Sequence, residues 1–239
     1  MTYSLRLHNP TALEYFATLV ADDDSLNLLE AAAAIAQDEF PQLDTQALLG
    51  ELDVLSERLR SRLPADASAS HKLRTLVAYF YQELGFAGNV NNYYDRSNSY
   101  LHQVLATRRG IPITLAVLFM ELASAVGLRA QGVCFPGHFL VKVELGNGDV
   151  LLDPFTGHSL TRERLDEFLQ NFRDESALPA ASQAPIEMFL RAAAPREILA
   201  RILRNLIEVH RTADDLLRLL AVQARLAVLL PQPAGGTLH

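Results

Sequence analysis

The residues best suited to chemistry lie in the central third of the chain. Cys134, the only cysteine, stands four residues before His138, and Asp153 and His158 follow. These are the residue types that serve as nucleophiles, general bases or metal ligands. The sequence has no GxGxxG, Walker, HExxH or CxxC motif, which argues against the usual dinucleotide, nucleotide and zinc-enzyme sites.

A metal site would have to combine His138, Asp153 and His158, with Cys134 as a further ligand. The residue types suit a divalent cation, but their spacing provides no compact pair on one helix face. We therefore expect neither a metal ion nor another cofactor.

Cys134 is also a candidate nucleophile because His138 follows it so closely. A reactive thiolate needs a positive neighbour or a helix N-terminus to lower the thiol pKa. Val133 and Phe135 flank Cys134 in a predicted strand, where neither is in view. The pattern favours a small buried apolar side chain.

The hydrophobic period predicts the elements that position these residues. A long apolar helix is expected from Ile113 to Val126, entered through the Gly110-Ile111-Pro112 turn and ending at Gly127. After Gly127 the period changes, and strands are predicted over residues 130–135, 139–145 and 150–153, with Gly146-Asn147-Gly148 as a hairpin turn. The fold class expected is α+β, with a buried helix packed on an antiparallel sheet.

Helical segments flank this core on both sides. Residues 1–85 predict an N-terminal helical bundle, residues 86–175 contain the core, and residues 176–239 comprise a linker and a pair of helices. The C-terminal pair is similar to one tetratricopeptide-like unit, which cannot bury its apolar face alone. Docking on the domain is the simpler expectation, and docking on a partner is the alternative.

The order of helix, His-bearing strand and Asp-bearing strand resembles the transglutaminase-like branch of the papain-type cysteine hydrolases. The strings NSYLHQVLATRRGIPITLAVLF, PGHFL and DPF resemble, more closely, the bacterial SirB-type transglutaminase-like proteins. The resemblance covers roughly residues 25 to 210 and is most specific from Asn98 to Leu118. It implies that His138 and Asp153 take the positions of the catalytic histidine and aspartate.

The resemblance also implies a missing nucleophile. Where those hydrolases place cysteine at the start of the helix, this sequence has Pro112, which carries no nucleophilic group. The nearest hydroxyl belongs to Thr114, about half a turn further along the helix. A secondary alcohol activated by His138 would be a poor substitute for a thiolate. We expect a retained but inactive His138–Asp153 dyad.

The strand register decides whether that dyad is in contact. An Asn147-Gly148 turn would place Asp153 opposite Lys142, about 13 Å along the strand from His138. A four-residue loop from Glu144 to Asn147 would place His138 directly opposite Asp153. We expect the second register, because Asp153 would otherwise carry an unpaired charge into a half-buried strand.

Two further groups could line a recognition cleft. The polar aromatic loop contributes Asn91, Asn92, Tyr93, Tyr94 and Asn98, although such residues also close polar turns against a core. Arg108 and Arg109 could clamp a carboxylate, or could interact with the terminal carbonyls of their own helix.

Charge and composition exclude several function classes. The 239 residues have a net charge of −7, and no Lys/Arg-rich run could follow a phosphate backbone, so a nucleic-acid partner is not expected. The most apolar stretch, residues 110–128, contains Pro112 and Glu121 and is too short for a membrane span. The N-terminal residues lack a secretory signal pattern, so we expect a cytoplasmic protein.

Two hypotheses from different classes follow. In the first, the protein is a non-catalytic transglutaminase-like interaction module that binds a protein or peptide through the cleft around His138. In the second, it is an amide hydrolase, protease or acyl transferase in which His138 is the base, Asp153 orients it, and Thr114 or Cys134 is the nucleophile. Pro112 favours the first hypothesis.

Overall fold

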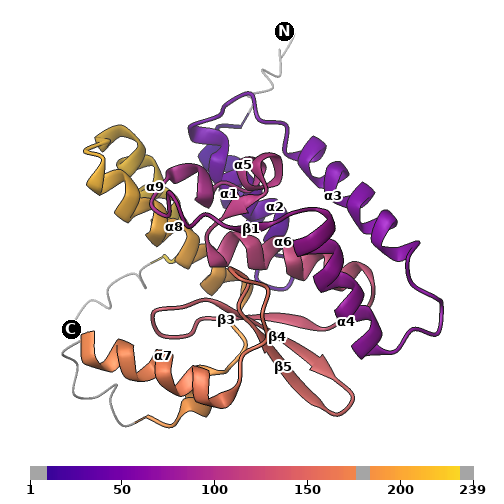
Figure 1. The fold of residues 1–239 in the computed structure, drawn as a ribbon. Coiled ribbons are helices and arrows are strands. Elements are labelled where there is room, and N and C mark those ends of the chain that lie inside the picture. The colour runs from indigo at the N-terminus through magenta and orange to yellow at the C-terminus, as the bar shows by residue number, and fades with distance from the viewer. Residues whose placement is uncertain (1–9, 176–183, 232–239) are drawn as a thin grey trace, which may run out of the picture.

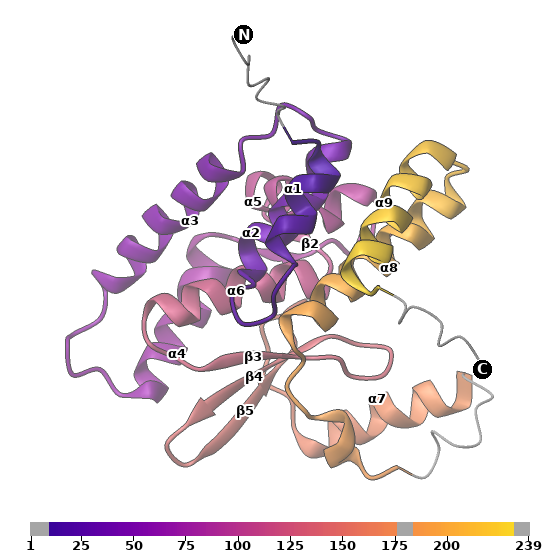
Figure 2. The same ribbon diagram turned by 180° about the vertical axis from the view of Figure 1, so that it is seen from behind.

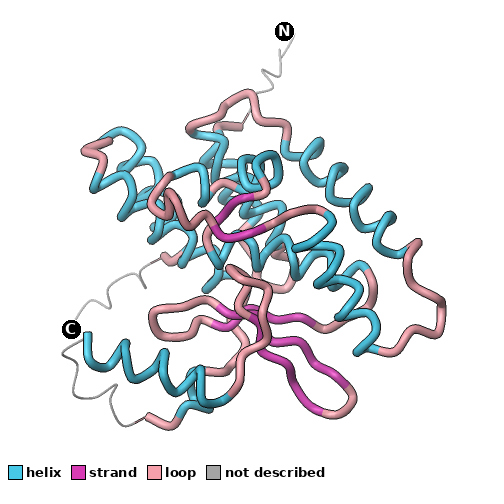
Figure 3. Tube along the Cα trace, in the orientation of Figure 1, coloured by secondary structure: helices cyan, strands magenta, loops and turns pink. Residues whose placement is uncertain are grey.

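The computed structural model describes residues 10–175 and 184–231. Helices occupy most of the molecule, with one small antiparallel sheet near one end (Figures 1 and 3). The predicted linker over residues 176–185 falls almost wholly outside the described residues.

The N-terminal helices begin at side-chain caps. They are α1 (Ala12–Leu19), α2 (Leu28–Ala34), α3 (Thr45–Arg60) and α4 (Ala69–Val77), the last continuing as the π-helical turn η2 (Ala78–Glu83). The Asp44 carboxylate accepts from the N–H groups of Gln46 and Ala47, and Ser68 caps α4. The N-terminal region is helical, as predicted, although its helices share one core with the later helices α6 (Pro112–Ala125) and α8 (Pro195–Thr212). Helix α1, which the sequence pattern did not indicate, precedes the others.

The core matches the predicted architecture. Helix α6 (Pro112–Ala125) packs against an antiparallel sheet of order β3-β4-β5, formed by Ala130–Val133, Leu140–Leu145 and Gly148–Leu152. Proline suits the first position of α6, because the N–H group it lacks would have no partner within the helix.

Alternation along β4 supplies apolar side chains to both faces of the sheet. Val141 and Val143 join the main core under α6, whereas Leu140 joins a second cluster with Leu165 and Leu169. The last two belong to α7 (Arg162–Glu175), and the 3₁₀ turn η4 (Ile186–Phe189) completes that layer. The sheet therefore lies between α6 and α7 (Figure 1).

The observed register corrects both sequence alternatives. Leu145 pairs with Gly148 and Val141 with Leu152, so the hairpin turn consists of Gly146 and Asn147 alone. Gly148 has φ +130°, a conformation that side-chain-bearing residues rarely adopt, and this allows the strand to start directly after the turn. Because each register buries the same faces, hydrophobic pattern alone could not select this one.

The C-terminal helices α8 (Pro195–Thr212) and α9 (Leu216–Leu229) pack on the domain. Helix α8 contacts α2 and α6, and α9 contacts α1 (Figure 2). Their apolar side chains belong to the same core as those of the N-terminal helices. The likeness to a tetratricopeptide unit stays a prediction.

A connecting region between η2 and α6 borders the candidate site. It contains two-residue parallel strands β1 (Ala87–Gly88) and β2 (Arg109–Gly110), the 3₁₀ turn η3 (Arg96–Ser99) and α5 (Leu101–Thr107). A further 3₁₀ turn, η1 (Ile35–Asp38), follows α2. None of the described helices is both long and apolar enough to cross a bilayer.

Candidate functional site

A cavity of about 400 Å³ lies at the N-terminal end of α6. The helix contributes Pro112 and Ile113, the segment before β4 contributes His138, and the segment after β5 contributes Asp153. The structure thus brings together the three positions that the resemblance singled out. Its remaining walls come from the 86–100 loop and from α8; the lining residues there include Val90, Tyr93, Arg201 and Asn205.

His138 is held by an aromatic ring. Its imidazole stacks on Phe168 of α7, with 3.9 Å between ring centroids and 21° between ring planes. Burial lowers the pKa of His138, Asp153 opposes that effect, and the positive charges of Arg164 and Arg201 add to it. The imidazole is therefore neutral over a wider pH range than an exposed histidine.

The Asp153 carboxylate accepts hydrogen bonds within its own turn. One carboxylate oxygen accepts from the Phe155 N–H at 2.8 Å, and the other accepts from the Thr156 hydroxyl at 2.9 Å. Within the described ranges no hydrogen bond joins Asp153 to His138, because the register places Asp153 opposite Leu140 rather than opposite His138. The expected direct pair is thus wrong in its geometry, although both side chains line one cavity.

Thr114 does not reach this cavity. Its side chain is fully buried, and its hydroxyl lies 2.7 Å from the Asn98 carbonyl oxygen and 3.1 Å from that of Ile111. The hydroxyl therefore ties the connecting region to the first turn of α6. A nucleophilic role for Thr114 is inconsistent with this burial.

Cys134 is exposed, which corrects the expectation of a buried side chain. It does not line the cavity around His138. Reduced solvation raises the pKa of the Cys134 thiol more than nearby Arg201 lowers it. In the described parts of the chain no group of three His, Cys, Asp or Glu side chains is placed to hold a metal ion. That the protein binds no metal stays a prediction.

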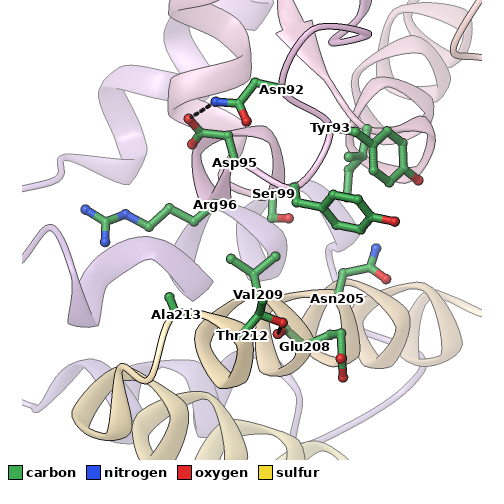
Figure 4. A pocket seen from close by; sticks show the side chains of 12 residues that line it. Asn92, Tyr93, Asp95, Arg96, Ser99, Asn205, Glu208, Val209, Thr212 and Ala213 are labelled. Atoms are coloured by element: carbon green, nitrogen blue, oxygen red, sulfur yellow. Dashed lines mark hydrogen bonds between the residues drawn. The ribbon is translucent and has the colours of Figure 1, made fainter.

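A second cavity, of about 650 Å³, lies between the 86–100 loop and α8. Asn92, Tyr93 and Tyr94 from the predicted cleft residues line it, as Figure 4 shows for the first two. Asn98 is buried instead, and its amide donates to the carbonyl oxygens of Asn92 and Tyr93 at 2.7 and 3.0 Å. Asn98 therefore shapes the loop, while Asn91 is exposed and lines neither cavity.

Arg108 and Arg109 support the connecting region and do not line the cleft. Arg108 ends α5 in the left-handed conformation, lies over the Phe86 ring at 4.7 Å and pairs with Glu51. Arg109 donates to the Gly85 carbonyl oxygen at 2.6 Å. Arg109 also donates to the Arg108 carbonyl oxygen at 2.9 Å, a contact at the end of its own helix of the kind that the alternative expected. The carboxylate clamp stays a prediction.

Sequence reasoning missed the contribution of α8. Arg201 and Asn205 line the cavity of His138, and Asn205, Glu208 and Thr212 line the second cavity. These four residues follow one another at steps of four, three and four, which places them on one face of the helix. That polar stripe is the signal in the sequence that indicates their role.

A model of the family described as "Transglutaminase-like superfamily" matches residues 46–204. The chain belongs to this superfamily. The matched range includes α6, the sheet and most of α8, and therefore contains Pro112, His138, Asp153 and Arg201.

Several relatives of this transglutaminase-like protein are bacterial proteins named UPF0162. One from Xylella fastidiosa strain Temecula1 is 37% identical over 211 residues, covering 88% of this chain and 74% of the relative. One from Pseudomonas aeruginosa is 35% identical over 209 residues, covering 87% of this chain and 74% of the relative. Human F-box only protein 21 is 41% identical over 86 residues, 36% of this chain and 14% of that protein. No solved structure matches the chain.

Proposed function

We propose that this protein is a non-catalytic transglutaminase-like module that binds a peptide or protein segment in the cavity of His138. The observation that carries the proposal is Pro112 at the first position of α6, where it lines the cavity beside His138 and Asp153. A helix N-terminus would lower the pKa of a thiol placed there, and proline provides no thiol to activate.

The SirB-type resemblance of residues 98–118 supports the same proposal. In that resemblance the position of the hydrolase cysteine falls on Pro112. The cavity that Pro112 lines also contains His138 and Asp153, which supports a site that has the histidine and the aspartate but no nucleophile at the start of α6.

The alternative nucleophiles do not replace the missing cysteine. Thr114 is fully buried with its hydroxyl against two carbonyl oxygens, and Cys134 lies outside the cavity with a raised pKa. Neither of these two described side chains therefore offers His138 a proton to remove at the start of an amide attack. An interaction role requires only the cavity and its lining side chains.

The match to a short part of human F-box only protein 21 also supports a modular role. There the similar 86 residues make up 14% of the protein, so a related segment forms one part of a longer chain.

Binding without turnover tests the proposal. The purified protein is incubated with a synthetic hexapeptide library that includes glutamine and asparagine, and the peptides are followed by mass spectrometry. We expect retention of a subset of peptides with unchanged masses. Retention should weaken in His138→Ala and persist in His158→Ala, because His158 is an exposed histidine outside the cavity.

Two results would overturn the proposal. Cleavage, deamidation or acyl transfer that is lost in His138→Ala and persists in His158→Ala would establish an enzyme. Equal retention by the wild type and His138→Ala would show that the cavity is not the binding site.

A further inference from the structure

The two cavities are adjacent. Tyr93 and Asn205 line both, so the cavity at the start of α6 lies next to the groove between the 86–100 loop and α8, and the two together are called the cleft. Figure 4 shows Tyr93 and Asn205 at the same end of that groove. A ligand in extended conformation can therefore occupy both cavities at once.

Arg201 provides a positive charge at one end of the cleft. It is half-buried and lines the cavity of His138, and within the described residues it has neither an ion pair nor a hydrogen bond. A guanidinium group presents a planar fork of donors that matches a carboxylate in a bidentate arrangement. Asn205, one helical turn further along α8, adds an amide beside it.

The other end of the cleft suits an apolar side chain. Ile111 is almost fully buried at its base, and Val209 and Ala213 of α8 and its C-terminal cap line the adjoining wall. Tyr93 and Tyr94 are 44% and 79% exposed, and their rings contact each other edge to face at 5.3 Å between centroids. Exposed aromatic side chains beside an apolar floor are typical of a binding surface.

We propose that this cleft binds the C-terminal end of a partner protein, with the terminal carboxylate on Arg201 and an apolar side chain from the preceding residues in the groove between the 86–100 loop and α8. This assignment rests on the proposed function and names the class of peptide that the module binds.

The charges around the cleft favour a single carboxylate over an acidic segment. The protein has a net charge of −7, and Asp95 and Glu208 line the groove while Asp153 lines the cavity. A segment with several acidic residues would be repelled by these carboxylates. A chain end with apolar neighbours brings one negative charge to Arg201, and its N–H groups are suitable donors for Asp153.

Fluorescence anisotropy with three labelled hexapeptide pools tests the inference on the full chain. In the first pool the last three residues are drawn from Leu, Ile, Val and Phe and the C-terminus is free. The second pool has the same residues and a C-terminal amide. The third is amidated and contains one internal glutamate. We expect the first pool to bind roughly tenfold or more tightly than the other two, as loss of a charge-assisted hydrogen bond implies.

Matched variants locate the two ends of the ligand. Arg201→Gln should weaken the free-carboxylate pool roughly tenfold and barely affect the amide pool. Arg204→Gln, an identical change at an exposed position of α8 outside both cavities, should leave binding unchanged. Tyr94→Ser should weaken every pool, whereas Leu217→Ser, at a side chain that is 83% exposed on α9, should not.

The outcomes separate this inference from the proposed function. Equal binding of the free and amidated pools, weakened by His138→Ala, would overturn the terminal-carboxylate assignment and leave peptide binding intact. Tighter binding of the glutamate pool would overturn the chain-end assignment and show that the cleft binds an acidic side chain. Failure of every pool to bind, together with turnover in the peptide library, would overturn both proposals.

Discussion

The His138 ring lies nearly parallel to the Phe168 ring at a centroid distance of 3.9 Å, so an aromatic side chain of α7 orients the histidine. The Arg164 guanidinium lies over the Phe168 ring, with its central carbon 4.7 Å from the ring centroid. Phe168 is therefore the side chain through which α7 positions the cavity histidine.

Removal of Phe168 should raise the pKa of His138. The Phe168→Ala variant exposes the imidazole to water, and burial is the main cause of its lowered pKa. Histidine ring signals followed by NMR through a pH titration will measure the change. Phe189→Ala, in the same apolar cluster, is the control and should leave the titration of His138 unaltered. An unchanged His138 titration in Phe168→Ala would contradict the role assigned to the ring.

A cysteine at the start of α6 should acquire a reactive thiol. In a Cys134→Ser background, Pro112→Cys places a thiol at the helix N-terminus in the cavity of His138. We expect alkylation by iodoacetamide at neutral pH roughly tenfold faster than that of Cys134 in the wild type, because a lowered pKa increases the thiolate fraction. The rate should fall again when His138→Ala is added. Alkylation no faster than that of Cys134 would mean that the cavity does not activate a thiol.

The Thr114 hydroxyl should matter for stability. Thr114→Val keeps the shape of the side chain but leaves the Asn98 carbonyl oxygen without its 2.7 Å hydrogen bond, at a cost of about 1–3 kcal/mol in the free energy of unfolding. Thr212→Val is the matched control, since its hydroxyl donates to the Glu208 carbonyl oxygen from an exposed position. Urea unfolding will measure both variants. A larger loss in the control would contradict the structural role of Thr114.

Two glycine substitutions should act in opposite directions. A Cβ at Gly88 would lie 2.3 Å from Cδ2 of Phe155, a cavity-lining ring, whereas a Cβ at Gly50 has nothing within 4 Å. Gly88→Ala should therefore destabilise the protein by about 1–3 kcal/mol and disturb ligand binding. Gly50→Ala, within α3, should stabilise it by about 0.5–1 kcal/mol. Thermal unfolding of both variants checks the signs; a stabilised Gly88→Ala would show that the approach to Phe155 is not tight.

A buried histidine should make stability depend on pH. The ring of His210 is 3.3 Å from the Tyr100 hydroxyl, which donates to Glu39, and Arg96 and Arg218 pair with that carboxylate. Burial is the main cause that lowers the pKa of His210; Glu39 and Asp215 oppose it, whereas Arg218 and Arg96 reinforce it.

The direction of this pH dependence follows from the pKa of His210 in the folded and in the unfolded state. In the unfolded chain His210 titrates near its ordinary 6.5, and in the folded protein it titrates lower. The unfolded chain therefore binds the proton more tightly. The contribution of neutral His210 to folding stability is fully present above pH 6.5 and is lost as the pH falls through the pKa of the folded protein. We expect the free energy of unfolding, measured with urea, to fall as the pH is lowered below 6.5, and to fall less in His210→Gln. An identical pH dependence in the variant would assign the effect to other groups.

The sequence sufficed to predict α6 and the three strands, because the change of hydrophobic period at Gly127 reflects local burial. It could not select the register, since every even shift of β5 keeps the same side chains buried. Asp153 was expected to need His138 as a partner, but its own turn supplies Phe155 N–H and the Thr156 hydroxyl. Such turn hydrogen bonds depend on backbone conformation that the hydrophobic pattern does not report.

The candidate site was predictable only where chain order carried the information. Pro112, His138 and Asp153 follow one another in a recognisable order and line one cavity. Arg201 and Asn205 arrive from a helix far along the chain, and only tertiary packing brings them to that cavity. The Arg109 guanidinium, by contrast, donates to the carbonyl oxygens of Gly85 and Arg108.

The contact of α1 with α9 constrains how this protein folds during synthesis. Nearby, Arg196 in the first turn of α8 donates to the carbonyl oxygen of Val20, the residue after α1, at 2.6 Å across 176 positions of sequence. A nascent chain that lacks α8 and α9 leaves exposed the faces of α1 and α2 that these two helices cover, so we expect the core to close only after α9 has left the ribosome. Closure of so long a loop slows folding and keeps apolar surface available to chaperones.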